Sequence, residues 1–116
     1  MPDRATILML SAAPGIWDRY LDLVEAFDGE PGAIDLLSDL ADYVAGLLVA
    51  GQGSDTELEA CLRGLEAYAE NTEGSEGLIA SAFFDSLPPE VLEGIRPKLG
   101  SRCSAALSHR RLASDA

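Results

Sequence analysis

The side chains that most often carry out chemistry in proteins are few and scattered in this sequence. The single histidine, His109, is followed by two arginines, and the tail around it offers neither a nucleophile nor an orienting carboxylate in a catalytic arrangement. We therefore expect His109 to titrate freely in solvent. The two cysteines, Cys61 and Cys103, are too few and too widely spaced for a disulfide scaffold or a zinc site. Both fall on apolar helix stripes, where a small buried side chain is the usual role of a free cysteine.

Carboxylates are abundant, but their spacing matches no metal or phosphate motif. A di-metal carboxylate bundle needs Glu-x-x-His pairs, and Ala106 stands three residues before His109. No calcium-loop spacing occurs, and no glycine-rich loop is followed by Lys and Ser or Thr. Asp35, Asp39 and Asp42 share one helix face, which is typical of a solvated surface. We predict a protein that is not an enzyme and that binds no cofactor and no metal.

The charge of the chain is its most pronounced feature. Twenty acidic residues against eight basic ones give a net charge of −12. Seventeen of the acids lie between Tyr20 and Ile95, where Arg63 is the only base, whereas five bases and one acid lie from Arg96 onward. Such a field repels nucleic acid and anionic membranes and attracts basic proteins. A role in solubility alone explains the same composition and stays open.

Length and composition indicate one soluble domain spanning residues 1–116. With 47% hydrophobic and 24% charged residues in 116, the chain suits a single core, and residues 1–13 and 109–116 are the segments expected to be loosely ordered. No apolar run approaches the ~20 residues of a membrane span. The leader Met1–Arg4 lacks the positive charge of a signal peptide, so we expect a cytoplasmic protein.

Apolar residues recur at helical spacing along nearly the whole chain. The predicted helices cover residues 14–27, 33–50, a stretch from the capping box Ser54–Glu57 to about 71, 75–87, 89–95 and a last one capped by Ser101. Residues 4–12 either extend the first helix or form their own. Helices of this length bury their stripes only against each other. The sequence predicts an all-α fold, a compact antiparallel bundle of about five or six helices or a stack of helix pairs.

The aromatic residues follow the predicted apolar stripes. Trp17, Tyr20 and Phe27 are expected in the core on the first stripe, while Phe84 and Tyr43 lie at the edges of theirs.

Four aliphatic stretches between Leu36 and Leu107 resemble a family of small all-helical bacterial proteins associated with toxin–immunity loci. They are residues 37–44, the Leu62-x-x-Leu65-Glu66 helix, residues 82–87 and residues 98–103. The resemblance implies a helical fold and a protein partner, and it carries no catalytic residues.

These observations favour a binding protein of the immunity or antitoxin type that occludes a basic toxin domain. The candidate contact residues are the carboxylates of the outer helix faces: Asp35, Asp39, Asp42, Glu59, Glu66, Glu70 and Glu73. The main alternative is a structural adaptor or homo-oligomeric helical module, and a DNA-mimicking inhibitor shares the acidic surface.

Overall fold

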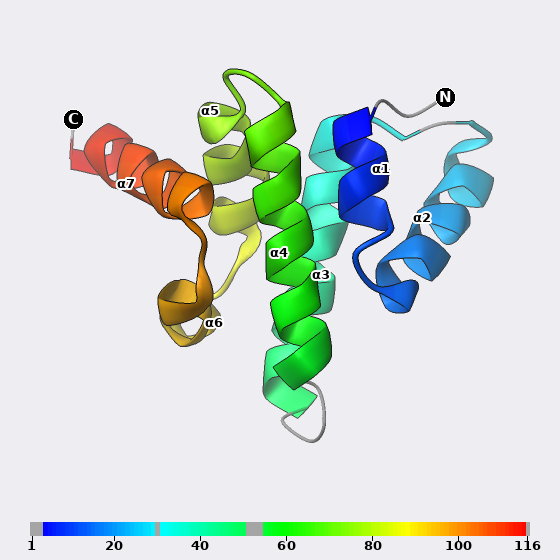
Figure 1. The fold of residues 1–116 in the computed structure, drawn as a ribbon, viewed down its shortest axis with the longest axis horizontal. Coiled ribbons are helices and arrows are strands. Elements are labelled where there is room, and N and C mark those ends of the chain that lie inside the picture. Colours follow the sequence, from blue (N-terminus) through cyan, green and yellow to red (C-terminus); the bar gives the residue numbers. More distant parts are fainter. Residues whose placement is uncertain (1–3, 30, 51–54, 116) are drawn as a thin grey trace.

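The computed structural model describes residues 4–29, 31–50 and 55–115, and all regular structure in these residues is helical (Figure 1). The α-helices are α1 (Arg4–Leu10), α2 (Pro14–Phe27), α3 (Ala33–Ala50), α4 (Asp55–Asn71), α5 (Glu76–Leu78), α6 (Pro89–Ile95) and α7 (Ser101–Asp115). Three short segments of other helix types are η1 (Ile79–Phe83), η2 (Phe84–Ser86) and η3 (Arg96–Lys98). The predicted all-α bundle is confirmed, with more helices than the five or six expected.

Helices α3 and α4 run antiparallel through the centre, with α1 and α2 on one side and α5 to α7 on the other (Figure 1). The predicted helices 14–27 and 33–50 are confirmed at both ends. Leu37, Leu40 and Val44 of α3 are almost fully buried, as the apolar stripe requires. Ser54, the first residue of the predicted capping box, lies outside the described residues.

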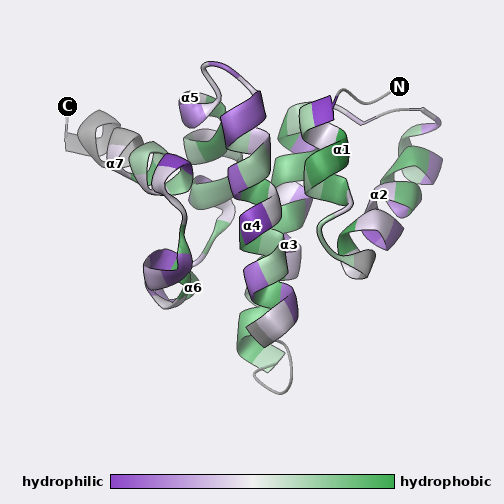
Figure 2. Cartoon of the chain, viewed as in Figure 1, coloured by the Kyte–Doolittle hydropathy of each residue, from purple (hydrophilic) through white to green (hydrophobic). Residues whose placement is uncertain are grey.

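The N-terminal residues form a separate helix that belongs to the core. Ala5, Met9 and Leu10 of α1 are buried, and α1 packs mainly against α4. Figure 2 shows α1 as mostly hydrophobic, whereas α4 carries both hydrophilic and hydrophobic residues. Residues 4–10 are therefore a packed element and not a loosely ordered leader, because their apolar side chains are covered by α4.

The helix predicted for residues 75–87 changes type along its length. It begins as α5, widens into the π-helical η1 and ends as the 3₁₀-helical η2. A π turn adds a residue to the helical repeat, so neighbouring side chains can turn toward the same core. Phe83 and Phe84 are both fully buried with an edge-to-face ring contact at 5.3 Å, and the prediction that Phe84 lies at an edge is wrong.

Ser75, at the start of the predicted helix 75–87, makes no capping hydrogen bond with its side chain. Ser75 is buried in a helical conformation, and its backbone carbonyl accepts the Ile79 amide at 2.8 Å. A capping serine normally has an extended backbone that turns its hydroxyl toward the first amides. The other predictions for this region are confirmed: α4 ends at Asn71, and Pro89 opens α6.

Among the described residues, none of the helices combines the length and the apolar content that a membrane crossing requires.

Candidate functional site

Each acidic side chain that the structure describes lies at least partly at the surface, since Ser75 is the buried polar residue of the described chain. The seven candidate carboxylates nevertheless differ in what they contact. Asp35, Asp42, Glu70 and Glu73 are exposed. The other three, Asp39, Glu59 and Glu66, have internal contacts that the helical pattern did not reveal.

Glu66 caps the N-terminus of α7. Its Oε2 accepts a hydrogen bond from the Arg102 amide at 2.9 Å, and its Oε1 accepts one from the Cys103 amide at 3.0 Å. The first amides of a helix have no partner within the helix, and a carboxylate there also complements the helix dipole. Glu66 was expected on the solvated face of α4, and the structure instead commits it to the fold. The cap predicted at Ser101 is also wrong. A capping residue precedes the first helical residue, and Ser101 is itself the first residue of α7.

The surroundings of Glu66 favour its charged form. Partial burial alone raises the pKa of Glu66, but the hydrogen bonds from the Cys103 and Arg102 amides and the charge of Arg102 together outweigh it. The pKa of Glu66 therefore lies below its ordinary value of 4.5. Because the folded pKa is lower than the unfolded one, the stabilisation is fully present above pH 4.5 and is lost as the pH falls through the folded pKa.

We expect Glu66→Ala to lower the free energy of unfolding by about 1–2 kcal/mol at neutral pH, because two helix amides lose a charged acceptor. Urea denaturation measures the loss. Glu70→Ala is the matched control, since Glu70 is exposed one turn further along α4, and we expect it to change stability by less than about 0.5 kcal/mol. The difference between wild type and Glu66→Ala should shrink on acidification below the ordinary pKa of Glu66. Equal losses for the two variants would contradict the cap.

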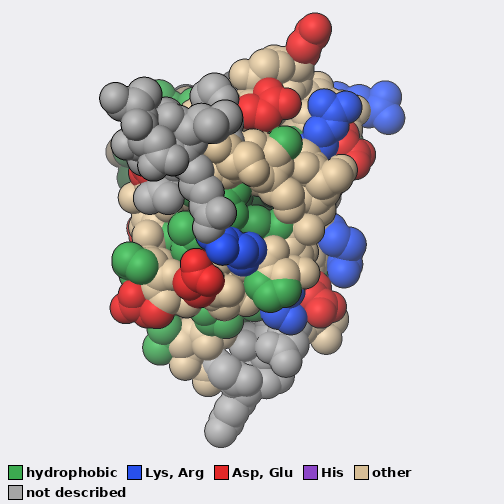
Figure 3. Space-filling view, turned by 90° about the vertical axis from the view of Figure 1, so that its left-hand side faces the viewer, with side chains coloured by type: hydrophobic (Ala, Val, Ile, Leu, Met, Phe, Trp, Pro, Cys, Tyr) green, Lys and Arg blue, Asp and Glu red, His purple; other side chains and the backbone are tan. Residues whose placement is uncertain are grey.

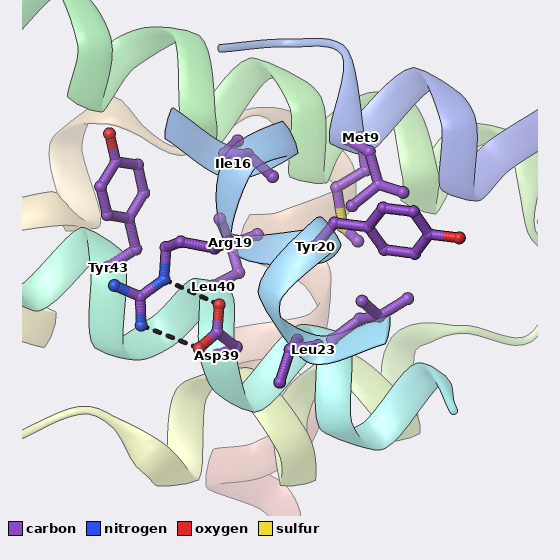
Figure 4. Close-up of a pocket in the computed structure, with 10 residues that line it drawn as sticks. Met9, Ile16, Arg19, Tyr20, Leu23, Asp39, Leu40 and Tyr43 are labelled. Atoms are coloured by element: carbon purple, nitrogen blue, oxygen red, sulfur yellow. Dashed lines mark hydrogen bonds and ion pairs between the residues drawn. The ribbon is translucent and has the colours of Figure 1, made fainter. Parts of the chain in front are cut away.

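Asp39 is held by Arg19 across the α2–α3 contact (Figure 4). Arg19 Nε donates to Asp39 Oδ2 and Arg19 Nη2 donates to Asp39 Oδ1, both at 2.8 Å. The guanidinium carbon also lies 5.3 Å from the centre of the Tyr43 ring. The hydrogen bond to Asp39 raises the pKa of Arg19 despite partial burial. This bidentate pair fixes the orientation of α2 on α3. Both carboxylate oxygens of Asp39 are engaged by Arg19, so Asp39 is part of the fold and not an unpaired contact residue.

Tyr43 completes this contact from α3. Burial is the largest cause that raises the pKa of Tyr43 to about 12, and hydrogen bonding to Glu57 and the charge of Glu57 raise it further, while Arg19 lowers it. We call Arg19, Asp39 and Tyr43 the clamp. The neighbouring cavity, which is lined by Met9, Ile16, Leu40 and the clamp residues, measures about 10 Å³. That is room for about one water molecule, so this site is a structural clamp and has no space for an organic ligand.

The face formed by α6 and α7 carries mixed charge (Figure 3). Lys98 Nζ lies 3.8 Å from Glu59 Oε1, and Arg96 Nη2 lies 3.5 Å from Glu93 Oε1. Glu59, a candidate contact residue, therefore has a basic partner within the chain. Basic residues of the C-terminal third thus offset acids on this face, and the acidic excess belongs to other parts of the surface.

Two stretches carry the acidic excess: residues 18–42 have eight acids against Arg19, and residues 55–76 have seven against Arg63. More of the acids in the first stretch, on and around α2 and α3, are exposed. No lysine or arginine occurs from Tyr20 to Leu62. Asp35 and Asp42 lie one turn before and one turn after Asp39 on the same face of α3, and Asp42 is close enough to influence Arg19 of α2. The candidate contact residues predicted from the sequence do not include the exposed acids Asp18, Asp22 and Glu25 of α2 or Asp28, which follows α2. Their alignment opposite the apolar stripe was the signal that could have identified them.

Two aromatic residues expected in the core are exposed. Trp17 is 40% exposed and Phe27 is 50% exposed, whereas Tyr20 is buried as predicted. The apolar stripe of α2 is broader than the part of α2 that the rest of the bundle covers, so Tyr20 is buried while Trp17 and Phe27 stay exposed. Trp17 lies beside Tyr20 with the ring centroids 5.4 Å apart. Trp17 is therefore an exposed ring that lies on a buried one, whereas its place on the stripe predicts the core.

The cysteines are buried, as predicted. Burial is the largest cause that raises the pKa of the Cys61 thiol to about 12, and burial together with Glu66 raises the pKa of Cys103. Both thiols are therefore protonated and inert at neutral pH. Within the described residues, no group of three or more His, Cys, Asp or Glu side chains is arranged to hold a metal ion. The side chain of His109 lies outside the described part of the chain.

Comparison of the chain with protein-family models, with curated protein sequences and with solved structures gives no match.

Proposed function

We propose that this protein binds and inhibits a basic protein domain, in the manner of an immunity protein or antitoxin. The observation that carries the proposal is the row of exposed carboxylates along α2 and α3, where the one base, Arg19, is already paired with Asp39. An acidic surface of this kind attracts a domain whose own function requires positive charge, such as a cleft that binds phosphates.

The inhibition would be steric and electrostatic. Exposed carboxylates speed the encounter with a basic surface, and the rigid α2–α3 pair then covers the surface that the partner uses for its substrate. The Arg19–Asp39 clamp supports this role, because it holds the two acidic helices in one fixed relation with two hydrogen bonds of 2.8 Å. The mechanism needs no catalytic group on this chain.

The test has two stages. The chain is first used to capture its partner from the native host, and the partner is identified by mass spectrometry and assayed with and without the chain. We expect inhibition at equal molar amounts. The association rate is then measured against salt, and we expect it to fall as the Debye length drops below about 10 Å. An association rate indifferent to salt would rule out the electrostatic mechanism.

A pair of variants with equal charge change locates the face. Asp35→Asn with Asp42→Asn removes two exposed carboxylates of α3, while Asp85→Asn with Glu90→Gln removes two exposed ones from η2 and α6. We expect the first pair to slow association about tenfold and the second pair to slow it by less than about threefold. Equal effects would mean that net charge alone acts and that α3 is no contact face.

A further inference from the structure

Helix α2 carries more apolar surface than the bundle covers. Ile16 and Tyr20 face the core and are buried. Trp17 and Leu21, which are four residues apart and therefore share a face, form a second stripe and are 40% and 49% exposed. Val24 continues this stripe one turn further and is half-buried. The stripe follows the helix axis from Trp17 to Val24. Trp17 and Leu21 are its exposed residues, whereas Val24 at its end packs partly against the core.

A groove begins at the first residue of this stripe. It has a volume of about 330 Å³ and is lined by Leu10, Ser11, Ala13 and Trp17, where α1 turns into α2. Leu10 and Ala13 are buried side chains of the core, and Trp17 is held beside Tyr20, so the walls are supported from below. A large apolar side chain of a partner can enter the groove while its neighbours one turn away contact Leu21.

The charge along the stripe identifies the chemistry of the partner. Asp18, Asp22 and Glu25 are exposed and form the row next to Leu21 on α2. The one base of α2, Arg19, is already paired with Asp39 of α3. The apolar stripe is therefore bordered by uncompensated negative charge, which suits an apolar segment flanked by Lys or Arg.

A second copy of this chain fits the same stripe poorly. In a symmetric dimer each α2 would face the other, and Asp18, Asp22 and Glu25 would approach the same three carboxylates. Like charges in contact cost stability, and each copy carries a net charge of −12. The stripe and groove therefore favour a basic partner over self-association.

We propose that the groove and the Trp17–Leu21–Val24 stripe of α2 form the docking site for an amphipathic helix with an apolar face and basic flanks, supplied by the partner protein. The basic character of the partner rests on the proposed function, whereas the position of the site rests on the exposed stripe. Helix against helix is the geometry in which side chains spaced one turn apart on the partner meet Trp17 and Leu21 in succession.

Trp17 is the only tryptophan of the chain, so its fluorescence reports docking directly. The probe is a synthetic helical peptide of about 18 residues with leucine on one face and lysine elsewhere, long enough to hold a helix on binding. We expect a saturable shift of Trp17 emission to shorter wavelength as water leaves its ring. A peptide with the same residues in shuffled order, which has no leucine face, should leave the emission unchanged at the same concentrations.

Two exposed residues provide a matched pair of variants. Leu21→Lys places a charge in the stripe of α2. Val49→Lys makes the same change of charge near the C-terminal end of α3, at a residue that is 81% exposed. We expect Leu21→Lys to weaken peptide binding at least about tenfold and Val49→Lys by less than about threefold. Both residues are exposed, so both variants should fold, which circular dichroism checks.

Three outcomes would overturn the docking site. The first is an unchanged Trp17 emission, and the second is equal weakening by the two lysine variants. The third is a dimer of the chain alone that sedimentation detects and that Leu21→Lys abolishes. A failure of the proposed function gives a different result: a peptide with glutamate in place of lysine would then bind as tightly, and the stripe would remain an apolar docking site without electrostatic selection.

Discussion

Replacement of Phe84 by alanine is expected to lower the free energy of unfolding by about 3–5 kcal/mol, whereas Phe27→Ala should lower it by less than about 1 kcal/mol. The two substitutions remove the same atoms. Phe84 is fully buried against Phe83, and Phe27 at the end of α2 is 50% exposed. Truncation of Phe84 leaves a cavity in the core next to Phe83, and truncation of Phe27 leaves none.

Urea denaturation at neutral pH measures both losses. A small domain has a total stability of about 5–15 kcal/mol, so Phe84→Ala brings the chain close to unfolding. If the chain folds too weakly for a transition to be measured, Phe84→Leu provides a smaller loss of about 1–1.5 kcal/mol. Equal losses for Phe84→Ala and Phe27→Ala would show that Phe84 lies at the edge of a regular helix and that the π turn of η1 does not bring it inside.

Gly64→Leu is expected to destabilise the fold by at least about 3 kcal/mol, because α1 lies directly on this residue of α4. A Cβ atom at Gly64 would lie 2.6 Å from Ala12 Cβ and 3.1 Å from the Met9 carbonyl oxygen. Neither atom is at the end of a flexible chain, so the whole helix must move. The movement exposes Met9 and Leu10, and each buried side chain of this size stabilises the fold by about 1.5–3 kcal/mol.

Gly46→Leu is the matched control on α3. A Cβ atom at Gly46 meets nothing within 4 Å, and the residue is exposed in the interior of a helix. Leucine is a better helix former than glycine, so Gly46→Leu should stabilise the chain by about 0.5–1 kcal/mol. Thermal or urea unfolding of the two variants should therefore change in opposite directions. A stabilised Gly64→Leu would contradict the close contact between α1 and α4.

The same pair of variants connects stability with the proposed docking site. Ala12 lies in the turn between α1 and α2, next to Ser11 and Ala13 of the groove. A displaced α1 changes the groove, so we expect Gly64→Leu to alter Trp17 emission and to weaken binding of the striped peptide. Gly46→Leu should leave the emission and the peptide binding unchanged, because no residue of α3 lines the groove.

The arrangement of charge decides where a partner is expected. Glu59 and Glu66 face the C-terminal bases and amides, which leaves α6 and α7 as a face of mixed charge. The acids of α2 and α3 have one local base, Arg19, and it serves Asp39. The candidate contact residues predicted from the sequence lie on α3, on α4 and just after it, whereas the contact face that we propose lies on α2 and α3.

The sequence by itself determined the class of fold, most helix boundaries and most of the inward residues. Helix 14–27 and helix 33–50 follow from local information: a proline at the first turn, glycines beyond the last, and apolar residues three and four apart. Burial of Cys61 and Cys103 follows from the same periodicity. These properties depend on neighbours within one or two turns, which a single sequence displays.

Only the tertiary structure decided which side chains are used by the fold and which stay available. The Glu66 cap joins residues 36 and 37 positions apart, and the Arg19–Asp39 clamp joins residues 20 positions apart. Periodicity shows the direction of a side chain on its own helix, but it does not show which helix lies opposite or how much of a stripe that helix covers. For that reason Trp17, which the pattern places in the core, is exposed, and Phe84, which the pattern places at an edge, is fully buried.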